Sequence, residues 1–70
     1  MTPLNSPVTG SVWKIQTSVG ASVQEGDELM ILESMKMEIP VEAEEDGTVT
    51  AILVAEGESV ADGQALVELE

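Results

Sequence analysis

Seventy residues make a single domain, and a chain of this size buries only about 60% of its unfolded surface, so its core must be thin. Fourteen Asp and Glu residues against two Lys give a net charge of −12, which argues strongly against nucleic acid or an anionic membrane surface as a partner. The chain has no Cys and no His, which excludes disulfides and thiolate-bound metals and removes the commonest general base and the best nucleophile.

Short β-branched and aliphatic runs separated by glycines follow one another along the chain. They span residues 10–15, 21–23, 29–32, 47–54, 58–60 and 65–69. Turn signals every six to ten residues around such runs predict a compact all-β sandwich or barrel. We expect glycine to supply positive φ at these turns, because it adopts that conformation without steric cost.

The segment 29–39, LMILESMKMEI, is the one stretch that taken alone could also form a helix, because it is rich in Leu, Met, Glu and Lys. Pro40 would stop such a helix, and the related run at the chain end is too short to hold one. We therefore predict a strand, a tight turn at residues 35–37 and a second strand. Pro40 then belongs on a sheet edge or at a bulge, where a missing N–H costs least.

Residues 6–33 and 43–70 are two copies of one pattern, related by an offset of 37 positions without a gap. All six glycines take part in the ten identities, which are Gly10/Gly47, Val12/Val49, Ile15/Ile52, Gly20/Gly57, Ser22/Ser59, Val23/Val60, Gly26/Gly63, Leu29/Leu66, Leu32/Leu69 and Glu33/Glu70. Two copies are too few for a solenoid. We expect two halves related by a pseudo-twofold axis that share one core, with residues 34–42 as a hairpin between them.

The chain offers little for catalysis of its own. Its Ser and Thr residues lack an evident activating partner, and the acidic runs at 25–28 and 42–46 lack the ligand spacing of a calcium loop. We interpret these runs as solvated faces, and we expect neither catalytic residues nor a metal site.

Lys36 is the candidate functional residue. It is one of only two cations, and it lies between Met35 and Met37 at the predicted hairpin tip. In an extended stretch the two methionines would point to one side and the lysine to the other. Exposed methionines are well suited to contact a partner protein, although they could also pack down onto the sandwich. Lysine carries the primary amine that amide-linked modification requires, although a surface lysine can also serve solubility alone.

The run Glu33-Ser-Met-Lys-Met-Glu38 resembles the biotin-attachment motif of biotinyl carrier domains, whose core is Met-Lys-Met. The flanks resemble the same family, with Val19-Gly20-x-x-Val23-x-x-Gly26-x-x-Leu29 before the motif, Gly47-Thr-Val after it and Gly57-x-x-Val60-x-x-Gly63-x-x-Leu66 near the end. The chain looks like a free-standing biotin/lipoyl attachment protein of the biotin carboxyl carrier type, or like a domain of a larger carboxylase, and the match covers residues 6–70.

The resemblance implies a flattened β-barrel of two four-stranded antiparallel sheets, formed by residues 1–70 as one biotinyl/lipoyl-type domain. It also implies that a biotin protein ligase joins biotin to Lys36, with Met35 and Met37 as recognition contacts. A biotin carboxylase would then load the carboxyl group and a carboxyltransferase would remove it. We expect a cytoplasmic carrier that is a monomer when isolated and not an enzyme itself.

Two departures and two alternatives accompany this resemblance. Ser34 stands where many family members have Ala, and the link between Trp13 and Gly26 is too short for the protruding loop of some bacterial carriers. Lipoyl domains share the fold, but their lysine usually follows Asp and precedes Ala, so lipoate is the less favoured cofactor. The other alternative is a structural or interaction module in which Lys36 is never modified.

Overall fold

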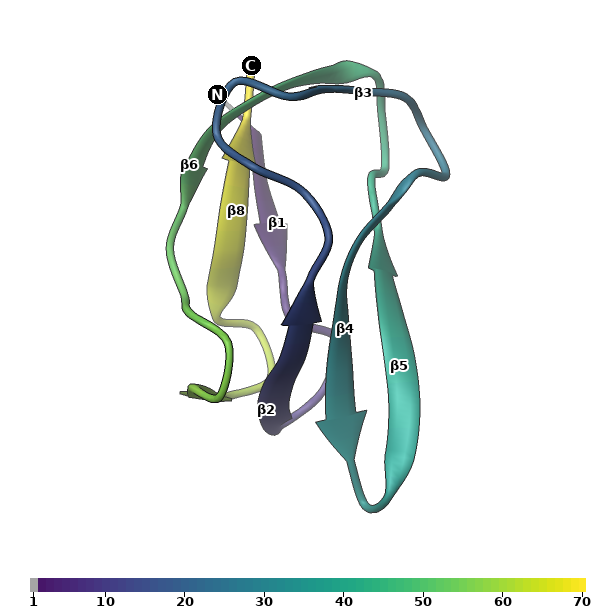
Figure 1. Ribbon diagram of the computed structural model, residues 1–70, viewed down its shortest axis with the longest axis vertical. Coiled ribbons are helices and arrows are strands. Elements are labelled where there is room, and N and C mark those ends of the chain that lie inside the picture. The colour runs from purple at the N-terminus through teal and green to yellow at the C-terminus, as the bar shows by residue number, and fades with distance from the viewer. Residues whose placement is uncertain (1) are drawn as a thin grey trace.

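The computed structural model describes residues 2–70, which form eight strands in two four-stranded antiparallel sheets (Figure 1). One sheet has the order β1 (Thr2–Asn5), β8 (Ala65–Leu69), β6 (Gly47–Ile52) and β3 (Ser22–Val23). The other has the order β5 (Met37–Glu42), β4 (Glu28–Ser34), β2 (Gly10–Ile15) and β7 (Ser59–Val60). The predicted fold class is confirmed. No helix that could cross a membrane occurs within residues 2–70.

The segment that could have been a helix is a β-hairpin, as predicted. Ser34 pairs with Met37, so the turn consists of Met35 and Lys36 alone and is one residue shorter than expected. Pro40 lies in β5, which is the outer strand of its sheet, and pairs with Ile31. An outer strand tolerates proline because one side of its backbone has no neighbour to receive an N–H.

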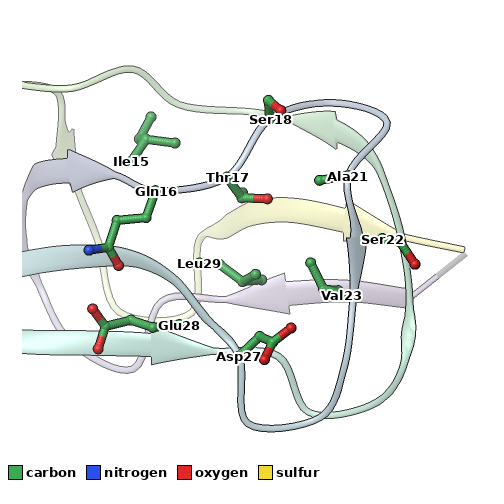
Figure 2. A pocket seen from close by; sticks show the side chains of 10 residues that line it. All are labelled: Ile15, Gln16, Thr17, Ser18, Ala21, Ser22, Val23, Asp27, Glu28 and Leu29. Atoms are coloured by element: carbon green, nitrogen blue, oxygen red, sulfur yellow. The ribbon is translucent and has the colours of Figure 1, made fainter.

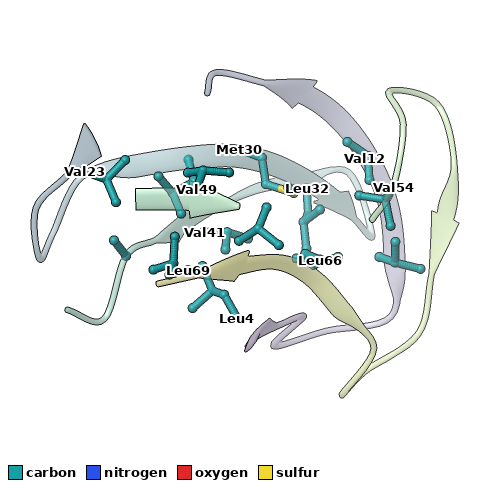
Figure 3. Packing of buried hydrophobic residues seen from close by; sticks show 14 residues of the cluster. Leu4, Val12, Val23, Met30, Leu32, Val41, Val49, Val54, Leu66 and Leu69 are labelled. Carbon is teal, nitrogen blue, oxygen red and sulfur yellow. The ribbon is translucent and has the colours of Figure 1, made fainter. Parts of the chain in front are cut away.

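The core lies between the two sheets and is almost wholly aliphatic (Figure 3). Of the ten positions that the repeat predicted to share a core, eight are buried, namely Val12, Val23, Leu29, Leu32, Val49, Val60, Leu66 and Leu69. The other two, Ile15 and Ile52, are partly buried and pack against it. Both halves therefore contribute equivalent faces to one core, as the pseudo-twofold requires.

The hydrogen bonds repeat with the same offset as the sequence. Gly20 donates its N–H to the Val49 carbonyl, and the equivalent Gly57 donates to the Val12 carbonyl, both at 2.7 Å. The equivalence also extends beyond the two copies seen in the sequence, because β1 and β5 correspond. Pro3 faces Glu68 in the β1–β8 ladder and Pro40 faces Ile31 in the β5–β4 ladder, which is again an offset of 37. The structural halves are thus residues 2–33 and 39–70.

The six glycines serve two different purposes. Four of them have φ between +85° and +93° and form turns as predicted, namely Gly20, Gly26, Gly57 and Gly63. The prediction is wrong for Gly10 and Gly47, which begin strands and lack positive φ. A Cβ on Gly10 would clash with the Glu33 carbonyl oxygen, and one on Gly47 would lie 3.0 Å from the Glu70 carbonyl oxygen. These two positions need glycine because neighbouring backbones approach closely there.

Candidate functional site

The turn between β4 and β5 joins the two halves of the fold. Within residues 2–70 the short segment 34–38 is the part that has no equivalent under the 37-residue offset. Figure 1 shows this turn projecting at one end of the molecule, while β3 lies at the opposite end. The molecule measures 30 Å along its longest axis, so the turn stands well away from β3. The duplicated frame therefore holds one unduplicated tip.

Met35 and Lys36 are both in the left-handed region, with φ of 52° and 66°. Positive φ at both central residues of a two-residue loop is the mark of a type I′ turn, which matches the twist of the flanking strands. The backbone at Met35 and Lys36 is therefore not extended, so the alternation of side chains that an extended stretch would give does not apply to this turn. Such turns prefer Asn and Gly, because a side chain such as that of Met or Lys costs about 1–2 kcal/mol in this conformation.

Both methionines and the lysine are exposed at this tip. The exposed fraction is 92% for Met35 and 63% for Met37, so neither side chain packs down onto the sandwich. Lys36 is exposed as well, and it lies in a short turn rather than in a long flexible loop. A primary amine at the tip of a hairpin can reach an enzyme's active site while the sheets remain outside it.

The strain in the turn gives a stability prediction. Replacing Met35 and Lys36 together with Asn and Gly should raise the free energy of unfolding by at least about 1 kcal/mol, which raises Tm by roughly 4–8 °C for a domain of this size. Thermal unfolding followed by circular dichroism measures the shift. Val19→Asn is the control, because Val19 is exposed and apolar but lacks positive φ. A double variant that melts no higher than the native chain would show that the positive φ of Met35 and Lys36 does not destabilise the turn.

The base of the hairpin is fixed to the loop between β1 and β2. The close approach of Gly10 to Glu33 brings the start of β2 against the end of β4. Beside it, the Ser34 hydroxyl donates a hydrogen bond to the Thr9 carbonyl at 2.9 Å. The Thr9 Oγ1 in turn accepts from the Asp62 N–H at 3.1 Å. No local sequence signal marks Thr9 or Asp62, because these bonds join residues 25 and 53 positions apart.

A second candidate place is a groove of about 550 Å³ near β3 (Figure 2). Figure 2 shows the residues between Ile15 and Ser18 along one of its sides. The groove is lined by Ile15, Gln16, Thr17, Ser18, Ala21, Ser22, Val23, Asp27, Glu28 and Leu29. The lining lacks Lys, Cys and His, so it offers no side chain suited to amide-linked attachment. The other lysine, Lys14, lies within β2 opposite Ile31 and not at a tip. The chemistry of attachment therefore points to the hairpin.

Comparison with known proteins shows what the chain as a whole is similar to. The profile of the family described as "Biotin-requiring enzyme" matches residues 2–69. The "Biotin/lipoyl attachment protein" of Bacillus subtilis (strain 168) is 42% identical over 62 residues, which cover 89% of this chain and 85% of the relative. The "Biotin carboxyl carrier protein" of Streptococcus mutans serotype c is 42% identical over 64 residues, which cover 91% of this chain but 49% of the relative.

A solved structure agrees with the sequence relatives. The crystal structure of the Kluyveromyces lactis urea carboxylase superimposes with a TM-score of 0.92 and 37% sequence identity. The match covers 97% of this chain and 6% of that protein. The same fold therefore occurs both in a small relative of similar length and as a small part of a large carboxylase.

Proposed function

Because this chain belongs to the family of biotin-requiring enzyme domains, we propose that it is a biotin carboxyl carrier with biotin joined by an amide bond to Lys36. The observation that carries the proposal is the strained, exposed turn at Met35 and Lys36. Within residues 2–70, Lys36 is the only lysine at a hairpin tip, and it lies between two exposed methionines. Strain that persists in a small, marginally stable domain is a mark of a functional site. We propose that residues 1–70 form this one carrier domain.

Attachment requires the Nζ of Lys36 to reach the activated carboxyl carbon of biotin in the active site of a biotin protein ligase. The Nζ forms the C–N bond, the activating group leaves with the electron pair of its bond to carbon, and the Nζ gives up a proton. The turn holds the base of the lysine still while its four-carbon stem stays mobile. When bound, biotin supplies a ureido nitrogen that can take up a carboxyl group and give it off again.

We propose two further partners, a biotin carboxylase that loads the carboxyl group and a carboxyltransferase that passes it to an acceptor. The carrier adds no catalytic group to either reaction. It contributes a tether that raises the local concentration of one reactive ring at two active sites. The net charge of −12 favours basic surfaces around those sites and increases the rate of encounter.

We propose that Met35 and Met37 are recognition contacts for these enzymes. Replacing both with Ala should lower the catalytic efficiency of biotin transfer by roughly tenfold, because two soft apolar contacts are lost at the interface. Because both side chains are exposed, Tm should change by no more than about 4 °C. Steady-state ligase kinetics and thermal melts measure the two effects.

The control for this pair is a Val19→Ala, Leu53→Ala double variant, which removes comparable exposed apolar area away from the hairpin. We expect native kinetics from it. A methionine variant that melts early yet takes biotin at the native rate would assign both residues to packing instead.

Intact mass after incubation with biotin protein ligase, biotin and ATP tests the proposed function. We expect one biotinyl group per chain. A parallel reaction with lipoate and a lipoate ligase tests the lipoyl alternative, which the "Biotin/lipoyl attachment protein" relative keeps open. A chain that takes up lipoate but no biotin would make it a lipoyl carrier, and one that takes up neither would make it an unmodified interaction module.

A further inference from the structure

The corner at Thr9 belongs partly to the duplicated frame and partly to the hairpin. The bond from the Asp62 N–H to the Thr9 Oγ1 has an equivalent in the other half, where the Glu25 N–H donates to the Asp46 Oδ1 at 2.9 Å. Both pairs are related by the offset of 37 positions. The fold therefore builds the same bridge twice, with a hydroxyl in one half and a carboxylate in the other.

The bond from the Ser34 hydroxyl to the Thr9 carbonyl is different. Ser34 lies outside both duplicated halves, in the segment that carries the turn. It is the last residue of β4, and it pairs with Met37 across the hairpin. The bond therefore fixes the hairpin, at the residue just before the turn, to a corner that the duplicated bridge already holds in place.

We propose that Ser34 is a positioning residue for biotin attachment, whose hydroxyl holds the Lys36 turn at a set angle to the sheets through the Thr9 carbonyl. This inference rests on the proposed function. β2 ends its pairing with β4 at Ser11, opposite Glu33, so none of the other strands described for residues 2–70 pairs with the hairpin beyond that point. The Ser34 hydroxyl supplies the lateral contact that the sheet does not provide there.

Such an anchor affects binding more than chemistry. A ligase that grips the hairpin must order the tip, and the cost of ordering is smaller when the free protein already holds it. Once the tip is bound, the Lys36 Nζ meets the same active site with or without the hydroxyl. Loss of the anchor should therefore raise KM and leave kcat unchanged.

The test compares Ser34→Ala, which removes the hydroxyl, with Ser34→Thr, which keeps it on a residue that strands favour. Ser34→Ala should raise the KM of the ligase for this chain about three- to tenfold, as expected for one hydrogen bond, with kcat within about twofold. Ser34→Thr should restore the native KM. In the free, unmodified protein, Ser34→Ala should also lower the ¹⁵N order parameters of the Met35 and Lys36 amides from about 0.85 toward about 0.6.

Thr50→Val is the matched control, because it removes another hydroxyl-to-carbonyl hydrogen bond, from Thr50 Oγ1 to the Glu68 carbonyl at 3.1 Å, in the sheet without the hairpin. It should leave KM and both order parameters at their native values. Thr9→Val removes the acceptor of the Asp62 N–H and should shift KM in the same direction as Ser34→Ala.

The other combinations of order parameters and KM in Ser34→Ala also have distinct meanings. Native order parameters in Ser34→Ala would overturn the anchor. Lower order parameters with a native KM would overturn its role in attachment, and a raised KM with native order parameters would mean that the ligase touches Ser34 directly. A native chain that takes up no biotin would overturn the proposed function, while the order parameters would still decide whether the anchor exists.

Discussion

Lys36→Arg should abolish biotin incorporation completely, and Lys14→Arg should leave it unchanged. Arginine keeps the positive charge and most of the length of lysine, but its delocalised guanidinium is always protonated and cannot act as the nucleophile. Intact mass spectrometry after reaction with biotin protein ligase, biotin and ATP measures incorporation directly. The circular dichroism spectrum of both variants should match that of the native chain, because both lysines are exposed.

Comparing the two lysine variants distinguishes loss of the attachment site from a change in net charge. Both lose a lysine and keep a cation, so any effect of net charge on the ligase is the same in each. Residual labelling of Lys36→Arg at the native level would show that the hairpin is not the attachment site. Loss of labelling in Lys14→Arg would show that β2 takes part in recognition.

Leu32→Ala should lower the free energy of unfolding by about 2–5 kcal/mol. Leu32 is completely buried and lies in β4 between Val12 of β2 and Ile39 of β5. A domain of this length has a total stability of about 3.5–10 kcal/mol, so one such cavity removes a large share of it. The equivalent Leu69→Ala should cost a similar amount, because Leu69 is also buried and pairs with Val49. Urea denaturation measures both losses.

Leu53→Ala is the control for these two variants, because Leu53 is 45% exposed and should lose far less. Equal losses for Leu32→Ala and Leu53→Ala would contradict the core position of Leu32. A large loss in one half with almost none in the other would show that the pseudo-twofold equivalence of Leu32 and Leu69 is geometric and not energetic.

The spacing of apolar runs and glycines predicted the all-β class, and the repeat predicted the shared core, because burial and turn formation leave a pattern of apolar residues and glycines along the sequence. The arrangement in two four-stranded sheets came from the family resemblance and not from this pattern. The repeat was incomplete at its ends. β1 and β5 share only Pro3 and Pro40 as an identical pair, and their equivalence became clear from the ladder registers.

The details of the site were less predictable for physical reasons. The conformation of Met35 and Lys36 runs against their local preference, and the pairing of Ser34 with Met37 imposes it by leaving two residues for the loop. The role of Gly10 depends on the approach of a backbone 23 residues away, at Glu33. Nothing near either position in the sequence encodes such long-range contacts.

Tryptic digestion of the biotinylated protein shows directly which lysine carries the biotin. Trypsin can cut this chain only after Lys14 and Lys36, because it has no arginine, and an amide on either lysine blocks the cut. Biotin on Lys36 predicts two fragments, residues 1–14 without biotin and residues 15–70 with it. A biotin-bearing fragment of residues 1–36, accompanied by free residues 37–70, would place the biotin on Lys14 and contradict attachment at Lys36.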